Sequence, residues 1–354
     1  MRPYRSVNDP AMNRQQLREQ ALRLNSLLDD LWHLDSIQAT TNQIVLAGEA
    51  RVPVPDFEVT ANGRLLAAGY QQARIEHVPT YQSPWRLLIT VPLAERAAQI
   101  PWLNIGLFAA TVATMLWIGG MAFTSWFLAI LLCHEFGHFL MARRHHIDAS
   151  WPYFIPAPNI LGTFGAFIRL RSPIRDRIGL FDMAVAGPLA GFVVAIVALV
   201  VGLMHSTVVT SAAGNGLSLG DSLLFKFLTW LLFPGMAANQ DILLHPIAFA
   251  GWAGLLVTML NLLPMGQLDG GHIAYALFPR QQKWLASATL LALAIASFWW
   301  PWWLIWAAIG LFLRPGHPPT LMDEVPLGRG RILLGCLAFA IFIISFMPVP
   351  FNMH

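Results

Sequence analysis

Apolar residues gather into long stretches over most of the chain after residue 100. Four of them can cross about 30 Å of hydrocarbon as helices: Trp102–Met121, Ser125–Ala142, Leu180–His205 and Pro246–Leu277. Three more follow, at Trp284–Trp300, Trp302–Leu313 and Ile332–Met347, of which the middle one is short for a crossing. The pattern predicts a polytopic α-helical membrane protein with six or seven transmembrane helices.

The first 98 residues follow a different pattern, in which shorter apolar runs stand among polar and charged residues. Leucines recur at helical spacing over residues 13–34 and predict an amphipathic helix. Further elements are expected as a strand at 43–52, a helix at 57–68 ended by Gly69, and strands at 72–77 and 85–91. We therefore predict a small α+β soluble domain over residues 1–98, made of a helix and a β-α-β-β unit.

Composition supports this division. Of the 354 residues, 56% are hydrophobic and 12% charged, whereas soluble domains carry roughly 25% charged residues. Residues 1–98 hold ten Arg and ten Asp or Glu, so the later chain is poor in charge. The net charge of +3 comes with no basic run, and no nucleic-acid partner is expected.

Basic residues predict the orientation in the membrane. The loop from Arg143 to Arg177 holds six Arg, whereas the segments 122–124 and 206–245 hold one Lys between them. The positive-inside rule therefore places the end of the second span in the cytosol, together with the N-terminal domain. Basic residues near the later span ends fit the same orientation if all seven spans exist: Arg280, Lys283, Arg314, Arg329 and Arg331.

A histidine pair with an adjacent carboxylate stands inside the second predicted span, in the segment HEFGH, which runs from His134 through Glu135 to His138. Residues four apart lie on one helix face, so both imidazoles can reach one zinc ion, and Glu135 can reach a water beside it. A charged group at the centre of a membrane helix costs at least about 2.5–3.5 kcal/mol on insertion scales, and such groups are usually functional. The pattern predicts a zinc site.

Two histidines leave such a site incomplete, because a catalytic zinc usually has three protein ligands and one open position. Asp269, in the fourth predicted span, is a strong candidate for the third ligand. His134 and His138 precede Arg143 by five to nine residues, which corresponds to roughly 8–14 Å of helix. Asp269 precedes Arg280 by a similar length, so the three side chains can share one depth.

The segment around Asp269 contains Pro264 and several glycines, which interrupt a helix. In lipid this is tolerated only where the freed backbone groups find protein or water, so a water-filled pocket is expected. Asn261 can hydrogen-bond a substrate backbone or an anionic intermediate, or it can bond between helices. His272 is an alternative ligand or a group that supports the ligands, ranked below Asp269 because a carboxylate completes the charge of the site.

The loop from Trp151 to Ser172 is apolar, yet it is too rich in Pro and Gly to continue a helix. It is expected to dip back into the bilayer as a re-entrant hairpin or to shield the site as an interfacial loop. Gly162 and Gly165 permit close backbone approach, and residues 166–170 can offer a strand edge to an extended peptide.

Four segments, in this order, resemble the site-2 protease family of intramembrane zinc metalloproteases: HEFGH, LGTFGAFIRL, AGPLAG and NLLPMGQLDGG. The resemblance implies that His134, His138 and Asp269 bind one Zn²⁺ ion and that Glu135 is the general base. It also implies that residues 162–170 form a membrane-associated hairpin that holds the substrate in extended form. No PDZ-like insertion is visible between the third and fourth spans, which is typical of the PDZ-lacking branch found in bacteria, archaea and plastids.

This interpretation makes residues 99–280 a catalytic transmembrane core, with a re-entrant loop at 151–172, and residues 281–354 a set of C-terminal transmembrane helices. The expected activity is hydrolysis of a peptide bond within or near the transmembrane segment of membrane-protein substrates. The expected location is a prokaryotic cell membrane, with contacts to the lipid bilayer; the oligomeric state is not predicted.

The alternative is a multi-pass metal or solute transporter that uses the same buried His, Glu and Asp residues. A transport path predicts polar residues on both sides of the bilayer midplane. The residues singled out above gather instead toward one leaflet, which favours the protease.

Overall fold

The computed structural model describes residues 14–39, 43–70, 72–78, 85–92, 100–171, 174–210, 217–237, 239–312 and 316–353. Some residues used in the predictions lie outside these ranges, among them Asn13 at the start of the first predicted helix, Ser172 at the end of the predicted re-entrant loop, and Arg314.

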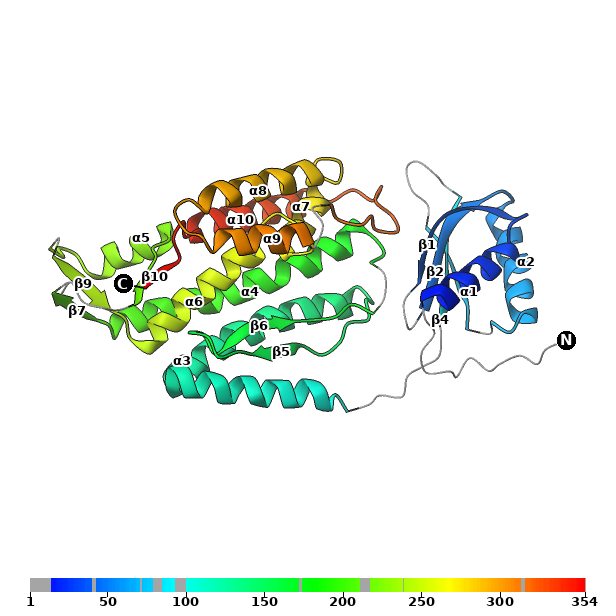
Figure 1. Cartoon of the computed structure of the whole chain (residues 1–354). Helices are drawn as coiled ribbons and strands as arrows, with labels where there is room; N and C mark the ends of the chain where they lie inside the picture. Colours follow the sequence, from blue (N-terminus) through cyan, green and yellow to red (C-terminus); the bar gives the residue numbers. More distant parts are fainter. Residues whose placement is uncertain are drawn as a thin grey trace.

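The N-terminal part is a small α+β unit (Figure 1). Its four-stranded antiparallel sheet has the order β1-β2-β4-β3, formed by β1 (Trp32–Ala39), β2 (Gln43–Ala50), β3 (Arg74–His77) and β4 (Arg86–Pro92). Helices α1 (Arg14–Ser26) and α2 (Val54–Ala67) cover one face. Alternate strand residues such as Ile44 and Ile89 meet Leu24 and Phe57 of the helices in the core.

The amphipathic helix predicted over residues 13–34 is too long, and the first strand was missed. Helix α1 ends at Ser26, and Trp32 begins β1 after a turn. The Trp32 ring lies 5.8 Å from that of Phe57, centroid to centroid, and its indole N–H donates to Asn25 Oδ1 at 3.2 Å. The apolar spacing continues past the end of α1 because the residues that follow, in a turn and in β1, pack into the same core.

The first two predicted spans form one element, α3 (Trp102–Arg144), which bends sharply at Gly120. Gly120 has φ 67° and ψ −176°, a conformation that glycine adopts readily because it has no Cβ. The chain doubles back there, so α3 consists of two helical halves that run in opposite directions (Figure 1).

Helices α3 and α4 (Arg177–Met204) are each long and apolar enough to cross a membrane. Four shorter apolar helices accompany them: α5 (Leu223–Leu232), α6 (Pro246–Asn261), α8 (Gln282–Ala296) and α9 (Trp303–Phe312). The remaining two are α7 (Asp269–Leu277) and α10 (Arg329–Ser345). The span predicted over 246–277 is divided into α6 and α7 by a non-helical segment that contains Pro264. The total of six or seven spans stays a prediction.

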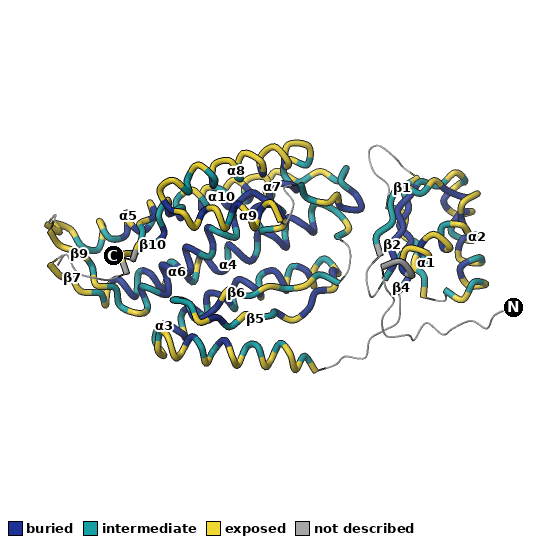
Figure 2. The backbone as a smooth tube through the Cα atoms, viewed as in Figure 1, coloured by how far each residue is buried: buried dark blue, intermediate teal, exposed yellow. Residues whose placement is uncertain are grey.

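Helix α4 packs against both α3 and α6 in the middle of the helical part (Figure 2). Glycines permit the contact with α6: a Cβ added to Gly202 would lie 2.0 Å from Ala248 N, and one added to Gly251 would lie 2.5 Å from Leu199 N. Large apolar side chains on the outside are exposed, with Trp117 at 80% and Phe298 at 87%. Such surfaces are typical of contact with lipid.

The start of α4 is also where α3 and α10 are joined to it. Asp182 accepts two hydrogen bonds from Arg331 of α10, at 2.7 and 2.8 Å, and lies 2.9 Å from Nε2 of His145, just after α3.

The loop predicted to be re-entrant forms a hairpin of β5 (Tyr153–Pro156) and β6 (Thr163–Phe167) beside α3. Asn104 donates to the carbonyls of Trp151 and Pro152, and Thr114 Oγ1 donates to Gly162 O at 2.7 Å, which fixes the hairpin to the first half of α3. Two other strand pairs lie with α5 at the end away from the N-terminal unit (Figure 1): β7 (Thr207–Thr210) with β9 (Gln240–Leu243), and β8 (Leu217–Leu219) with β10 (Phe351–Met353).

Candidate metal centre

His134 and His138 lie one turn apart in the second half of α3, and both are buried. Their Nε2 atoms are 3.0 Å apart, and their ring centroids 4.8 Å. The four-residue spacing therefore brings both imidazoles to one point, as the helical period requires.

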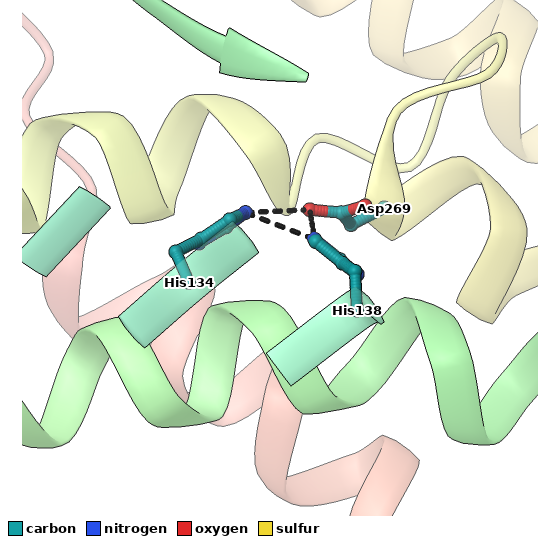
Figure 3. Close-up of side chains that lie close together, drawn as sticks. All are labelled: His134, His138 and Asp269. Carbon is teal, nitrogen blue, oxygen red and sulfur yellow. Dashed lines mark hydrogen bonds and ion pairs between the residues drawn. The ribbon is translucent and has the colours of Figure 1, made fainter. Parts of the chain in front are cut away.

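Asp269 completes this group from α7, of which it is the first residue. Its Oδ2 lies 3.3 Å from Nε2 of His134 and 3.3 Å from Nε2 of His138 (Figure 3). Among the described residues, these three are the one group of His, Cys, Asp and Glu side chains able to hold a metal ion together.

Two glycines after Asp269 allow the start of α7 to fold tightly against the segment before it. A Cβ added to Gly270 would lie 2.0 Å from Leu262 O, and one added to Gly271 would lie 2.5 Å from Gly266 O. The carboxylate of Asp269 is thus carried by backbone that is closely packed against the end of α6.

The donor atoms fit a zinc ion. Atoms that bind a tetrahedral zinc at about 2.0–2.1 Å lie about 3.3 Å from one another, close to the spacing of these three atoms. Glu135, beside His134, is buried and interacts electrostatically with both histidines and with Asp269. Its Oε2 has no hydrogen-bond partner among the described residues. A buried carboxylate oxygen without a partner is the group that a water at the open position would satisfy.

Helix α4 orients His138. The Nδ1–H of His138 donates to the carbonyl of Met183 at 2.8 Å. This bond selects the tautomer in which Nε2 has a free lone pair, directed toward Asp269 and His134.

Close packing of α4 against α3 forms one wall of the site. A Cβ added to Gly187 would lie 2.1 Å from His138 Nε2, and one added to Gly191 would lie 3.2 Å from His134 Cβ. The small residues of AGPLAG therefore leave the space that the two imidazoles fill.

Gly187→Ala is accordingly expected to weaken zinc binding by about 10–100-fold, the range found when a group that orients a ligand is lost. The new methyl group would occupy the place of His138 Nε2, the nitrogen expected to bind the ion. Metal analysis of the purified protein measures this. Gly106→Ala is the matched control, because a Cβ there would have nothing within 4 Å. Normal zinc affinity in Gly187→Ala would show that His138 does not bind the ion in this position.

The auxiliary candidates lie in different places. Asn261, at the end of α6, has its Nδ2 3.2 Å from Nε2 of His134, so it lies at the candidate metal centre and forms a hydrogen bond between α6 and α3. His272 lies outside the three-residue group, and its Nδ1 is 2.7 Å from Nε2 of His317. Gly162 and Gly165 have φ values of 75° and 97° and shape the hairpin; the contacts described for them are with α3 and within the hairpin.

Sequence reasoning missed His317, which lies in the segment between α9 and α10. It is separated from His272 by 45 positions, and no motif or periodicity connects them. Its position against the helix that carries Asp269 could be found only from the tertiary structure.

Comparison with known proteins gives one family. The model of peptidase family M50 matches residues 122–298, which is half of the chain. The chain is 35% identical over 232 residues to "Probable zinc metalloprotease EGY1, chloroplastic" of Arabidopsis thaliana, which covers 63% of this chain and 42% of the relative. It is 30% identical over 230 residues to "Probable zinc metalloprotease EGY2, chloroplastic" of the same plant, covering 63% and 40%.

The chain spans about two fifths of the length of these relatives. The names of the relatives specify the chloroplast, which does not fit the expected prokaryotic cell membrane. No solved structure matches. The matched region contains all four predicted motifs together with His134, Glu135, His138 and Asp269, and the chain belongs to peptidase family M50, the membrane-embedded site-2 protease family.

Proposed function

We propose that this protein is an intramembrane zinc metalloprotease that hydrolyses a peptide bond within or near the transmembrane segment of membrane-protein substrates. The observation that carries the proposal is the convergence of His134, His138 and Asp269 beside the unpartnered carboxylate of Glu135. The zinc metalloproteases among the relatives support it and do not favour the transporter alternative.

In this mechanism His134, His138 and Asp269 would hold one Zn²⁺ ion. When bound, it would supply Lewis-acid polarisation of the scissile carbonyl and make water a stronger nucleophile. Glu135 takes a proton from the attacking water and delivers it to the leaving amine. The Asn261 amide nitrogen lies 3.2 Å from His134 Nε2. With that nitrogen bound to zinc, the amide N–H would be free to donate a hydrogen bond to the oxygen on which negative charge develops.

The hairpin beside α3 would receive the substrate. Phe164 and Phe167 of β6 are 74% and 49% exposed, and an extended peptide can pair with the edge of a two-stranded sheet. A helical substrate must unwind first, because its carbonyls are occupied by hydrogen bonds within the helix. Gly162 and Gly165, both with positive φ, shape this hairpin.

We further propose that residues 1–98 form a soluble domain, 99–280 the catalytic core and 281–354 the C-terminal helices, with six or seven crossings. His138 lies six residues before the end of α3 at Arg144, within the part of that helix that leads to the basic loop. The positive-inside rule supports placing this end and the N-terminal domain on the cytosolic side.

The test uses purified full-length protein in liposomes with two single-span substrates that differ only in a Leu-Leu or Gly-Gly pair in the span. Each Gly lowers helix stability by about 1 kcal/mol, so the Gly-Gly substrate is expected to be cut up to about thirtyfold faster. Mass spectrometry locates the cut. Chelation should stop cleavage and added zinc should restore it; cleavage that survives complete zinc removal would refute the proposal.

A further inference from the structure

The sheet of the N-terminal unit has a second apolar face, turned away from its own helices. Val45 and Ala47 of β2 and Leu88 of β4 lie on it, and all three are buried. Strand β2 is thus buried on both faces, since Ile44 and Leu46 point into the α1–α2 core. An antiparallel sheet with helices on one face ordinarily leaves its other face to solvent. Because the residues on the other face of this sheet are buried, another segment must cover them.

The cover is the segment 316–325, which we term the strut and which lies between α9 and α10. Leu321 and Met322 pack on Val45, Ala47 and Leu88. Figure 1 shows this orange segment extending from the helical part toward β1 and β2. The strut and the apolar patch that it covers are more than 200 positions apart in the chain, and so are Arg86 and its partners in the strut.

Charged side chains add to this contact. Arg86 of β4 donates to Glu324 at 3.3 Å and to the carbonyl of Leu321 at 3.2 Å. Glu76 of β3 pairs with Arg175, just before α4, at 2.6 Å. The N-terminal unit is therefore seated on the helical part by apolar packing and by ion pairs.

The other side of the strut contacts α7, the helix that begins with Asp269. His317 Nε2 is 2.7 Å from Nδ1 of His272, and its ring stacks on Tyr275 at 4.5 Å between centroids. The hydroxyl of Tyr275 donates to Asp323, which also accepts from Thr320 Oγ1 at 2.7 Å. Asp323 thus closes the strut into a turn and holds it to the helix.

These contacts lie close to the ligand. His272 and Asp269 are three residues apart in a helix of nine residues, so they share a face. The strut therefore connects the sheet of the N-terminal unit to the helix face that presents the metal ligand.

We propose that the N-terminal domain controls the metal centre through the strut. With the domain docked, His317 and Asp323 hold α7 in the position that places Asp269 beside His134 and His138. When the domain undocks, the strut loses its contacts with the apolar face of the sheet and with Arg86. His272 and Tyr275 of α7 then lose their partners in the strut, and zinc binding weakens. The inference rests on the metal centre of the proposed function, and His317 and Asp323 are positioning residues in it.

The docking contact is tested from both sides. Leu88→Arg places a charge in the patch from the sheet, and Glu324→Arg repels Arg86 from the strut without altering the sheet. Leu66→Arg is the matched control, because Leu66 is 56% exposed on α2 of the same domain. Leu88→Met keeps the patch apolar and should behave as wild type.

The measurements are the zinc dissociation constant, by competition with a chelating dye, and the visible spectrum of the Co²⁺-loaded protein. Leu88→Arg and Glu324→Arg are each expected to weaken zinc binding about tenfold and to alter the cobalt spectrum, because groups that orient a metal ligand are no longer held in place. Leu66→Arg and Leu88→Met should change neither. Hydrogen exchange of the β1–β4 amides checks that the sheet stays folded; if Leu88→Arg unfolds it, Glu324→Arg decides.

The transmission step is tested by His317→Ala, which should also weaken zinc binding about tenfold. If the strut carries the effect, His317→Ala combined with Glu324→Arg should bind zinc no more weakly than either single variant. Unchanged zinc affinity in Glu324→Arg, or fully additive losses in the double variant, would overturn the proposal. These zinc measurements do not depend on cleavage. If the zinc affinities are coupled in this way but the cleavage assay detects no product, the protease assignment is refuted and the coupling stands.

Discussion

Glu135→Gln is expected to abolish peptide hydrolysis while the purified protein keeps its full zinc content. Glutamine has nearly the same shape, but its amide cannot take the proton of an attacking water. Loss of a general acid–base group costs typically about 10²–10⁴ in rate, which an end-point cleavage assay registers as no product. Zinc is retained because Glu135 is not one of the three ligand side chains.

Two measurements on the same sample decide this result: metal content, and cleavage of a single-span substrate in liposomes. Glu135→Asp is the informative partner variant, because it keeps the carboxylate but shortens its reach, and partial activity is expected. Wild-type proteolysis by Glu135→Gln would refute Glu135 as the general base. Loss of zinc from this variant would instead show that Glu135 belongs to the ligand set.

Asp269→Ala is expected to remove zinc. Asp269 is the one carboxylate of the group and comes from a different helix, and without it only the two imidazoles on α3 remain. The loss of affinity should exceed the 10–100-fold typical of groups outside the ligands. Metal analysis measures it, and Asp221→Ala is the matched control because Asp221 is an exposed aspartate just before α5 and lies outside the group of three.

His272→Ala distinguishes the two candidates for the third ligand. Since His272 contacts His317 and lies outside the group of three, its removal should weaken zinc binding far less than Asp269→Ala. Zinc retained by Asp269→Ala but lost from His272→Ala would reverse the assignment.

The error in the N-terminal domain shows where local pattern fails. Leucines recur at helical spacing through residues 13–34, yet the helix ends at Ser26. Leu28, Leu31 and Trp32 are buried all the same, in a turn and a strand that complete the same core. The spacing of apolar residues indicates which segments contribute to the core, but a short apolar run does not predict whether its backbone is a helix, a turn or a strand.

The candidate chemistry could be predicted from local sequence pattern alone. The spacing of His134 and His138 is one helical turn, so any helix through this segment brings both imidazoles to one face, and the scarcity of charge in the apolar spans made Glu135 and Asp269 conspicuous. These are consequences of local geometry and of the cost of burying charge in lipid.

The contacts that support the site could not be predicted from the sequence and are seen only in the folded chain. The carbonyl of Met183 selects the tautomer of His138, Gly187 leaves space for its ring, and His317 reaches the helix of Asp269 from a distant segment. Each of these contacts joins residues tens of positions apart. Local sequence pattern carries no record of such pairs, because they form only when the helices pack and bring their side chains within contact.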